Sequence, residues 1–374
     1  MHGEKIRIVG VGGAGCRIVD RLHELICDAS SLVAVNTDSR SLDEARAAAK
    51  LQIGEALTNG LGAGGDVTIG RQAARDDVGM IRSLLSGADL VLLVAGLGGG
   101  TGTGALPVIL DVAHDEGALV LCFATLPFEF EGRNRMKTAE ETLEILKESA
   151  DALLVVPNQR LSEYAGTATL AATFEKVDEI LAKGVGGIEK LLTQPGLIHL
   201  DFADVKHMVR GGGGLCTLGF GEGTGKGKAR QAVESLLDNP LLEKGQVVES
   251  AEALLLSIVG GPDLTLKEMG EITDAVSART PKDCHLFIGT VVDESWEGKV
   301  TLTAIVSDEW RAEPAAEEEG EGKAATGRKG KPLQTKLKLE SYGKGRFKDV
   351  EPTILDGEDL DIPTFVRRGI PVAK

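Results

Sequence analysis

The stretch Gly98-Gly-Gly-Thr-Gly-Thr-Gly104 decides the fold of this chain, because it connects a buried strand pattern to a helix pattern. The all-apolar run Leu90–Val94 precedes it, and the helix-like segment Ala105–Asp115 follows it. Glycines at this density are expected to serve no packing purpose. Interleaved with threonines, they can form a nest of backbone amides with hydroxyl groups beside it. The stretch therefore predicts a loop that surrounds a polyphosphate.

A second glycine loop, Gly10-Val-Gly-Gly-Ala-Gly15, also joins a strand pattern to a helix pattern. Its glycines let backbone N–H groups approach a phosphate at the positive end of a helix. Asp38 follows the next strand at about the distance at which a dinucleotide fold places its ribose carboxylate. An NAD-dependent oxidoreductase is therefore an alternative. However, amide nests at two neighbouring strand ends fit a di- or triphosphate better than a single pyrophosphate. The motif G-x-x-x-x-G-K-S/T is absent from the sequence, which excludes a Walker-type NTPase.

Short apolar runs alternate with helix patterns from Lys5 to about Pro157. Nearly all-apolar strands suit a parallel sheet that is buried on both faces, so the pattern predicts a Rossmann-like, doubly wound α/β domain. The expected strands are Ile6–Val11, Leu32–Val35, Leu90–Val94, Leu119–Phe123 and Leu153–Val156, and the expected helices include Arg17–Ile26, Ala105–Asp115 and Arg135–Glu148.

A long amphipathic helix is expected next, although Gly184, Gly186 and Gly187 weaken its middle. A second, smaller α/β domain follows, with strands at Ala253–Val259, Leu286–Val292 and Val300–Val306 and a helix near Leu266–Val276. A Glu-rich and then Lys/Arg-rich segment predicts a disordered linker before a short tail peptide. The expected division is 1–173 for the nucleotide domain, 174–198 for the central helix, 199–308 for the second domain, 309–358 for the linker and 359–374 for the tail.

The composition of the chain disfavours several kinds of binding partner and cellular location. The chain has 374 residues and a formal net charge of -16, and a field of that sign disfavours binding to nucleic acid or to an anionic membrane surface. Its five cysteines are widely spaced without a C-x-x-C pair, which indicates reduced thiols and no metal site. A strand pattern starts at Lys5 without a signal peptide, and no apolar run is long enough for membrane insertion. A cytoplasmic protein is expected.

Several motifs in a fixed order resemble those of the tubulin/FtsZ superfamily, and specifically FtsZ. The matching segments are Gly10–Gly15, Ala34–Asp38, Leu61–Gly64, Gly98–Gly104, Pro127–Gly132 with Arg135, Val156–Arg160, Pro195–Val205 and Asp361–Arg368. The resemblance implies a bacterial FtsZ-type GTPase that binds GTP and GDP with Mg²⁺, hydrolyses GTP and polymerises for cell division.

The resemblance also assigns the nucleotide-binding residues. The glycine loops Gly12–Cys16 and Gly98–Gly104 would hold the phosphates, and a middle loop, Ala63–Gly65, would sense the γ-phosphate. Glu131 and Arg135 would contact the ribose and phosphate side, Asn158 the base or ribose, Phe174 would stack on the base and Asp178 would recognise guanine. The loop residues are Gly12, Gly13, Ala14, Gly15, Cys16, Ala63, Gly64, Gly65, Gly98, Gly99, Gly100, Thr101, Gly102, Thr103 and Gly104.

The segment His199–Asp204 resembles a loop that inserts into the nucleotide pocket of the next subunit of a head-to-tail homopolymer. By that resemblance Asp201 and Asp204 would orient the attacking water and manage charge at the γ-phosphate, assisted by His199. The family usually has Asn at the positions of His199 and Cys16, so a slow or non-hydrolysing co-assembly scaffold is a further alternative.

The tail Asp361–Arg368 resembles the peptide with which FtsZ binds an adaptor of the FtsA type. An apolar trio next to two arginines suits folding on binding. We therefore expect action at the division site together with other division proteins.

Overall fold

The apolar runs of the sequence form one sheet in the computed structural model. The structure describes residues 5–26, 28–165, 169–194, 196–198, 200, 202–211 and 215–307, and the backbone of 354–355 and 358–359. The chain splits into one unit covering 1–316 and another covering 317–374. In the second unit β12 (Ile354–Leu355) pairs antiparallel with β13 (Glu358–Asp359). Apart from these four residues, the expected linker (309–358) and tail peptide (359–374) lie outside the described residues.

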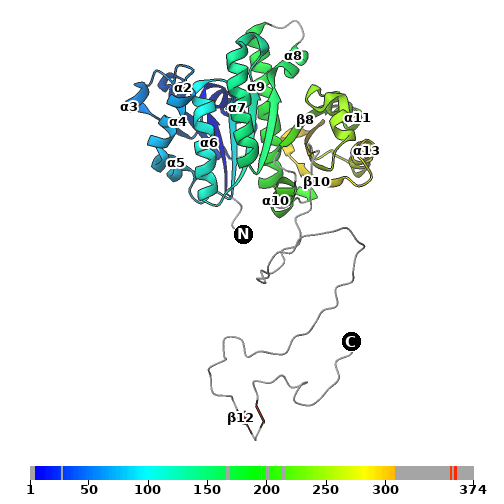
Figure 1. Cartoon of the computed structure of the whole chain (residues 1–374). Coiled ribbons are helices and arrows are strands. Elements are labelled where there is room, and N and C mark those ends of the chain that lie inside the picture. Colours follow the sequence, from blue (N-terminus) through cyan, green and yellow to red (C-terminus); the bar gives the residue numbers. More distant parts are fainter. Residues whose placement is uncertain are drawn as a thin grey trace, which may run out of the picture. The chain divides into compact units, whose positions relative to one another are not determined.

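The first half of the sheet is parallel and follows the predicted doubly wound layout. Within the described residues the complete strand order is β3-β2-β1-β4-β5-β6-β8-β11-β9-β10-β7. Strands β8 and β10 of this sheet are labelled in Figure 1. The parallel strands are β1 (Ile6–Val11), β2 (Leu32–Asn36), β3 (Ala49–Gln52), β4 (Leu90–Gly96), β5 (Leu119–Leu126) and β6 (Ala152–Pro157).

Helices cover both faces of this parallel sheet. Neighbouring residues of β4 show the alternation, since Leu92 packs in one buried cluster and Leu93 in another. The first cluster includes α1 (Gly12–Leu22) and α9 (Leu170–Thr193). The second includes α4 (Val67–Asp76), α5 (Val78–Leu85), α6 (Gly100–Asp115) and α7 (Arg133–Ser149). Burial on both faces explains why the strands are almost wholly apolar.

The predicted long helix is confirmed, because α9 runs unbroken through Gly184, Gly186 and Gly187. Its glycines let the helix lie directly against the sheet. A Cβ atom added at Gly184 would lie 2.7 Å from a methyl carbon of Leu218, and one at Gly187 would lie 2.4 Å from Thr303 Oγ1. The close approach to β8 (Leu215–Thr224) and β11 (Lys299–Ser307) compensates for the low helix propensity of glycine.

The second half of the sheet is mixed. Strand β11 pairs antiparallel with both β8 and β9 (Ala253–Gly260), and β10 (His285–Val292) runs parallel to β9. Helices α11 (Lys228–Leu237) and α13 (Leu266–Ser277) pack on it around a third buried cluster. A capping box formed by Thr265 and Glu268 starts α13. The expected second α/β domain is therefore present, with β8 as an addition to the expected strands.

Shorter elements complete the described chain. They are the helices α2 (Ser39–Glu44), α3 (Glu55–Thr58), α8 (Asn158–Ala165), α10 (Phe202–Gly211) and α12 (Gln246–Glu249), the 3₁₀ turns Ala29–Ser31, Glu129–Glu131, Pro240–Gly245 and Glu294–Trp296, and the edge strand β7 (Gly196–Ile198). Among the helices described, none combines the length and the apolar character that a membrane span requires.

Candidate nucleotide-binding site

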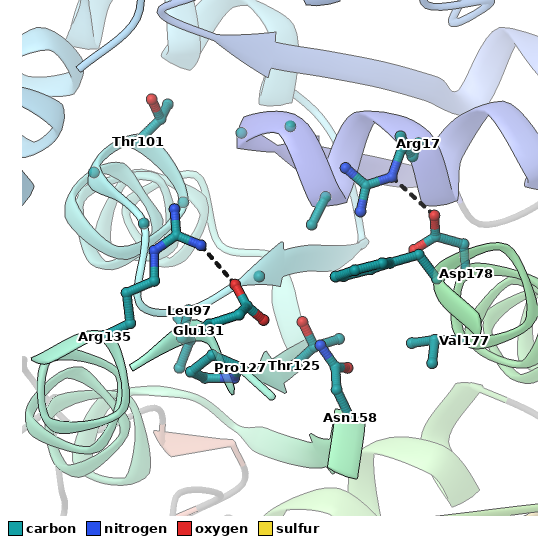
Figure 2. Close-up of a pocket in the computed structure, with 18 residues that line it drawn as sticks. Arg17, Leu97, Thr101, Thr125, Pro127, Glu131, Arg135, Asn158, Val177 and Asp178 are labelled. Carbon is teal, nitrogen blue, oxygen red and sulfur yellow. Dashed lines mark hydrogen bonds and ion pairs between the residues drawn. The ribbon is translucent and has the colours of Figure 1, made fainter. Parts of the chain in front are cut away.

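A cavity opens where β1, β4 and β5 end and where α1 and α6 begin. Its volume is about 380 Å³. Such a crevice at the carboxyl ends of parallel strands is the usual ligand position in a doubly wound sheet. The described lining residues are Gly12, Gly13, Ala14, Arg17, Gly96, Leu97, Gly99, Gly100, Thr101, Gly102, Thr125, Pro127, Glu131, Arg135, Asn158, Phe174, Val177 and Asp178 (Figure 2).

Both glycine loops present helix N-termini to this cavity. The residues that precede α1 and α6 are Val11 and Gly99, and neither forms a side-chain cap. The first N–H groups of these helices therefore lack the partner that a capping side chain supplies. With the positive ends of two helix dipoles beside them, these groups suit an anionic ligand such as a phosphate chain.

The glycines of the two loops divide into open and packed positions. Gly12 and Gly98 adopt left-handed backbone conformations, with φ of 72° and 92°. Cβ atoms added at Gly13 or Gly99 would meet nothing within 4 Å. Gly13 and Gly99 therefore leave room for a ligand close to the backbone, and a contact with a ligand there remains a prediction.

Other glycines of the Gly98–Gly104 loop, called the signature loop from here on, have a packing role, so the expectation that they have none is wrong. An added Cβ atom at Gly102 would lie 2.5 Å from the carbonyl oxygen of Gly96, and one at Gly104 would lie 2.3 Å from that of Val67. One at Gly100 would lie 2.8 Å from the Cβ atom of Ala63. These glycines hold α6 against α4 and the sheet, and that packing fixes the start of the helix at the cavity.

The two threonines of the signature loop are hydrogen-bonded within the protein. Thr103 is buried, and its hydroxyl accepts from the backbone N–H of Gly98 at 2.8 Å. The hydroxyl of Thr101, which lines the cavity, lies 2.6 Å from that of Thr37. Thr103 therefore shapes the loop, whereas Thr101 faces the ligand space.

Several predicted contact residues are not among those lining the cavity. Gly15 is a packing residue, since an added Cβ would lie 2.4 Å from the carbonyl oxygen of Val94. Cys16 points into the core, where burial raises the pKa of its thiol to about 12. Ala63 is buried beside Gly100, and Gly64 and Gly65 have left-handed φ angles with open space around them. Contact between this middle loop and a γ-phosphate remains a prediction.

Glu131 and Arg135 form one wall of the cavity. Arg135 Nη1 donates to Glu131 Oε2 at 2.5 Å, and Glu131 Oε1 accepts from the backbone N–H of Phe128 at 2.9 Å. The carboxylate is thereby held between a helix residue and the preceding turn. In Figure 2 this pair lies toward Thr101, on the side away from Asp178. That placement suits contacts to ribose and phosphate oxygens.

Phe174, Asp178 and Asn158 gather at the other end of the cavity. Phe174 packs edge-on against Phe128, with ring centroids 5.0 Å apart. Asp178 is buried in α9, and burial raises the pKa of its carboxyl, opposed by the nearby Arg17. Arg17 Nε donates to Asp178 Oδ2 at 2.9 Å (Figure 2). An aromatic ring beside a buried acid suits a planar base with N–H donors.

Arg17 is a cavity residue that the sequence reasoning missed. It follows the glycine loop, and on α1 it lies four residues after Gly13 and so on the same helix face. Because Gly13 belongs to the predicted phosphate loop, this four-residue spacing is the sequence feature that could have identified Arg17 as a cavity residue.

Asn158 supplies an observation that favours a ligand. Its side chain is buried, and among the described residues its Oδ1 has no hydrogen-bond partner. A buried amide oxygen without a partner costs free energy, so most such atoms are paired in native proteins. A ligand with an N–H or O–H group in this cavity would supply the partner.

The three predicted catalytic residues are only partly described. His199 and Asp201 lie outside the described residues. Asp204 is half-buried in the first turn of α10 and is not one of the cavity's described lining residues. The described part of the chain also contains no group of three or more His, Cys, Asp or Glu side chains suited to a metal ion.

The fold and the cavity are those of an α/β nucleotide-binding protein. The description "Tubulin/FtsZ family, GTPase domain" matches residues 5–166, and "FtsZ family, C-terminal domain" matches residues 214–309. The chain belongs to the FtsZ family and contains its GTPase domain. The alternative of an NAD-dependent oxidoreductase is therefore wrong.

Similar proteins agree with this assignment. Cell division protein FtsZ 1 of Methanocaldococcus jannaschii is 40% identical over 303 residues, covering 81% of this chain and 82% of that protein. The corresponding protein of Archaeoglobus fulgidus is 39% identical over 302 residues, covering 81% of each. A solved tryptophan-to-tyrosine mutant of M. jannaschii FtsZ superposes with a TM-score of 0.76 at 39% identity, covering 82% of this chain and 92% of that one. These relatives are archaeal, so they do not support the narrower expectation of a bacterial protein.

Proposed function

We propose that this GTPase assembles head-to-tail into filaments for cell division, and that its hydrolytic site is completed between adjacent subunits. One observation supports the proposal most directly. The nucleotide cavity contains helix N-termini, Arg17 and Arg135, whereas the predicted catalytic Asp204 is not among its described lining residues. An acid from a second copy of the chain would complete the site. A solved M. jannaschii FtsZ dimer covers 85% of this chain at a TM-score of 0.76, which favours self-association.

In this proposal the two glycine loops bind the phosphates, with Gly13 and Gly99 offering backbone close to the ligand. Phe174 stacks on the base, and Asp178 accepts from the N1–H and 2-amino groups of guanine. Adenine lacks both donors and would leave the carboxylate unpaired. Asn158 Oδ1 accepts from the base or ribose, which satisfies its buried oxygen. Mg²⁺ would neutralise phosphate charge and take its ligands chiefly from phosphate oxygens and water.

Hydrolysis then depends on assembly. Asp201 and Asp204 of one subunit orient and polarise the water that attacks the γ-phosphate bound by the next subunit, and His199 assists. GTP favours the polymer because its γ-phosphate contacts both subunits, and loss of that group weakens the contact.

The tail Asp361–Arg368 extends the proposal to partners. Its resemblance to the adaptor-binding peptide supports docking on a membrane-tethering adaptor of the FtsA type, and thereby action with other division proteins at the cytoplasmic division site. The same tail resemblance is the remaining support for a bacterial source. No nucleic-acid partner and no direct membrane insertion belong to the proposal.

The test measures phosphate release from GTP against protein concentration, with sedimentation of the same samples. We expect specific activity to rise above a threshold together with pelletable polymer. Asp204→Ala should form polymer but lose about 10²- to 10⁴-fold in turnover, the usual contribution of a positioned acid or base. Asp111→Ala, which removes an exposed acid from α6, is the matched control and should behave as the wild type. Specific activity independent of concentration would contradict a shared site.

A slow co-assembly scaffold is the second candidate. Cys16 favours it, because this side chain is buried in the core and is not among the described residues that line the cavity. Polymer that pellets with GTP but releases no phosphate, and gains turnover in His199→Asn, would favour this second function.

A further inference from the structure

Arg17 occupies a position in the cavity that the phosphate-binding and base-stacking roles do not explain. Its Nε donates to Asp178 Oδ2 at 2.9 Å, and its guanidinium carbon lies 6.0 Å from the ring centroid of Phe174. The Arg17 side chain is 52% exposed, whereas that of Asp178 is 7% exposed. The acid is thus part of the wall, and the guanidinium extends from it into the cavity (Figure 2).

The terminal nitrogens of Arg17 are available to a ligand. A guanidinium has five N–H donors, and the bond to Asp178 uses the one on Nε. Among the described residues, neither Nη atom of Arg17 donates a hydrogen bond. The contacts with Asp178 and Phe174 restrict the side-chain conformation, so these remaining donors are held at this end of the cavity.

We propose that Arg17 is a specificity-determining residue that donates to O6 of the guanine base. The inference rests on the proposed function, in which Asp178 accepts from N1–H and the 2-amino group. In guanine, O6 is bonded to the carbon next to N1. A base whose N1–H donates to Asp178 would therefore place O6 near the neighbouring Arg17. Arginine donating to guanine O6 is a common recognition contact elsewhere. Adenine has an amino donor at that position, and it would oppose the donors of Arg17.

The ion pair with Asp178 gives Arg17 a second, indirect effect on guanine recognition. Asp178 can accept from both the N1–H and the 2-amino group of guanine only while it is ionised, and burial works against the ionised form. The adjacent guanidinium favours that form. Arg17 therefore supports recognition by Asp178 and adds a contact of its own, and the experiment has to separate these two effects.

The experiment measures the dissociation constants of GDP, 6-thio-GDP and ADP for the full-length protein. In 6-thio-GDP a sulfur replaces O6, which weakens that acceptor and keeps N1–H and the 2-amino group. We expect Arg17→Met to weaken GDP binding about 10- to 100-fold, the range of a good arginine–guanine contact. Binding of 6-thio-GDP should weaken much less, so the preference of the wild type for GDP over 6-thio-GDP should largely disappear.

Two further variants provide controls. Arg21→Met removes an exposed arginine one turn later on α1 that also lowers the pKa of Asp178 but does not line the cavity. It should retain the wild-type preference for GDP over 6-thio-GDP. Arg17→Lys keeps a positive charge beside Asp178 but replaces the planar guanidinium, and the preference should fall with it.

The outcomes separate the inference from the proposed function. If Arg17→Met loses GDP and 6-thio-GDP affinity equally, or if Arg17→Lys restores both affinities fully, then Arg17 acts only through Asp178 and the O6 contact is refuted. If the wild-type protein does not prefer GDP to ADP, guanine recognition itself fails, whatever the Arg17 variants show.

Discussion

Gly104→Ala should destabilise the protein although alanine favours helices. The added Cβ would lie 2.3 Å from the carbonyl oxygen of Val67, 2.5 Å from the backbone nitrogen of Arg71 and 2.9 Å from the carbonyl carbon of Gly70. All these atoms belong to the backbone of α4 or its start, so a rotamer change cannot relieve the clash. Helices α4 and α6 must therefore move apart along their contact.

The magnitude follows from two opposing contributions. Overpacking a well-packed interior costs about 1–3 kcal/mol, and rigid backbone neighbours favour the upper end. Replacing glycine by alanine in a helix contributes up to about 1 kcal/mol of stabilisation. The net expectation is a loss of about 2 kcal/mol in the free energy of unfolding, or about 4 °C in melting temperature for a chain of this size.

The assay is thermal and urea unfolding followed by circular dichroism, without nucleotide. Gly79→Ala is the matched control, because Gly79 lies in the exposed part of α5 and an added Cβ would meet nothing within 4 Å. That control should stabilise the protein by up to about 1 kcal/mol. A melting temperature for Gly104→Ala equal to or above that of the wild type would refute the packing role of this glycine.

Three other outcomes are expected. Lys190 donates to Asp293 at 2.7 Å, with side chains 9% and 16% exposed, so Lys190→Met should cost about 3 kcal/mol or more in urea unfolding. Burial by itself would raise the pKa of Asp293, but hydrogen bonds from Lys190 and Ser295 outweigh it and hold that pKa below its ordinary value. The pairing therefore stabilises the protein at neutral pH, and its contribution should disappear as the pH falls below about 4. The melting temperature should accordingly fall less between neutral and acidic pH in Lys190→Met than in the wild type. An equal fall in both proteins would contradict this. Among the described cysteines, Cys284 should alkylate first at pH 8. Burial and the charge of Asp283 raise the pKa of Cys284 to about 11, but this thiol is only half-buried, whereas Cys16 and Cys122 are buried and burial raises their pKa to about 12; peptide mass spectrometry would reveal any other order. Asn158→Leu should leave the nucleotide-free melting temperature within about 1 °C or raise it, because an unpaired buried oxygen is removed, while it reduces the stabilisation by GDP. A large loss of stability without nucleotide would show that Asn158 is a structural residue.

Five strands of the parallel half could be predicted because each is an apolar run followed by a turn or a glycine loop. The edge strand β3 was missed because its sequence, with Lys50 and Gln52, is half polar. Strand β8 was missed because Gly219, Gly221 and Gly223 interrupt its apolar pattern. These glycines lie under α11, where an added Cβ at Gly223 would clash with the backbone carbonyl of Lys228. Although α11 begins only a few residues after β8, its packing across the strand is a tertiary contact that the apolar pattern does not show, so the pattern looked like a loop.

Of the candidate site, too, the sequence predicted one part and missed another. Gly13, Gly99, Arg135, Phe174 and Asp178 were predicted from motifs and do line the cavity. Whether each contacts a nucleotide remains a prediction. Arg17 was missed because an arginine on the first helix has many possible directions, and only the packing of α9 beside α1 places Asp178 next to it.

The sequence by itself determined the family, the doubly wound half of the sheet and the two loops at strand ends, because these depend on short-range patterns of apolar residues and glycines. The tertiary structure decided which glycines of one motif face the cavity and which hold helices together. It also decided that Arg17 pairs with Asp178 in the cavity and that the buried Oδ1 of Asn158 has no partner among the described residues. Those properties depend on atoms far apart in the chain, since burial and hydrogen bonding are set by the neighbours that folding brings into contact.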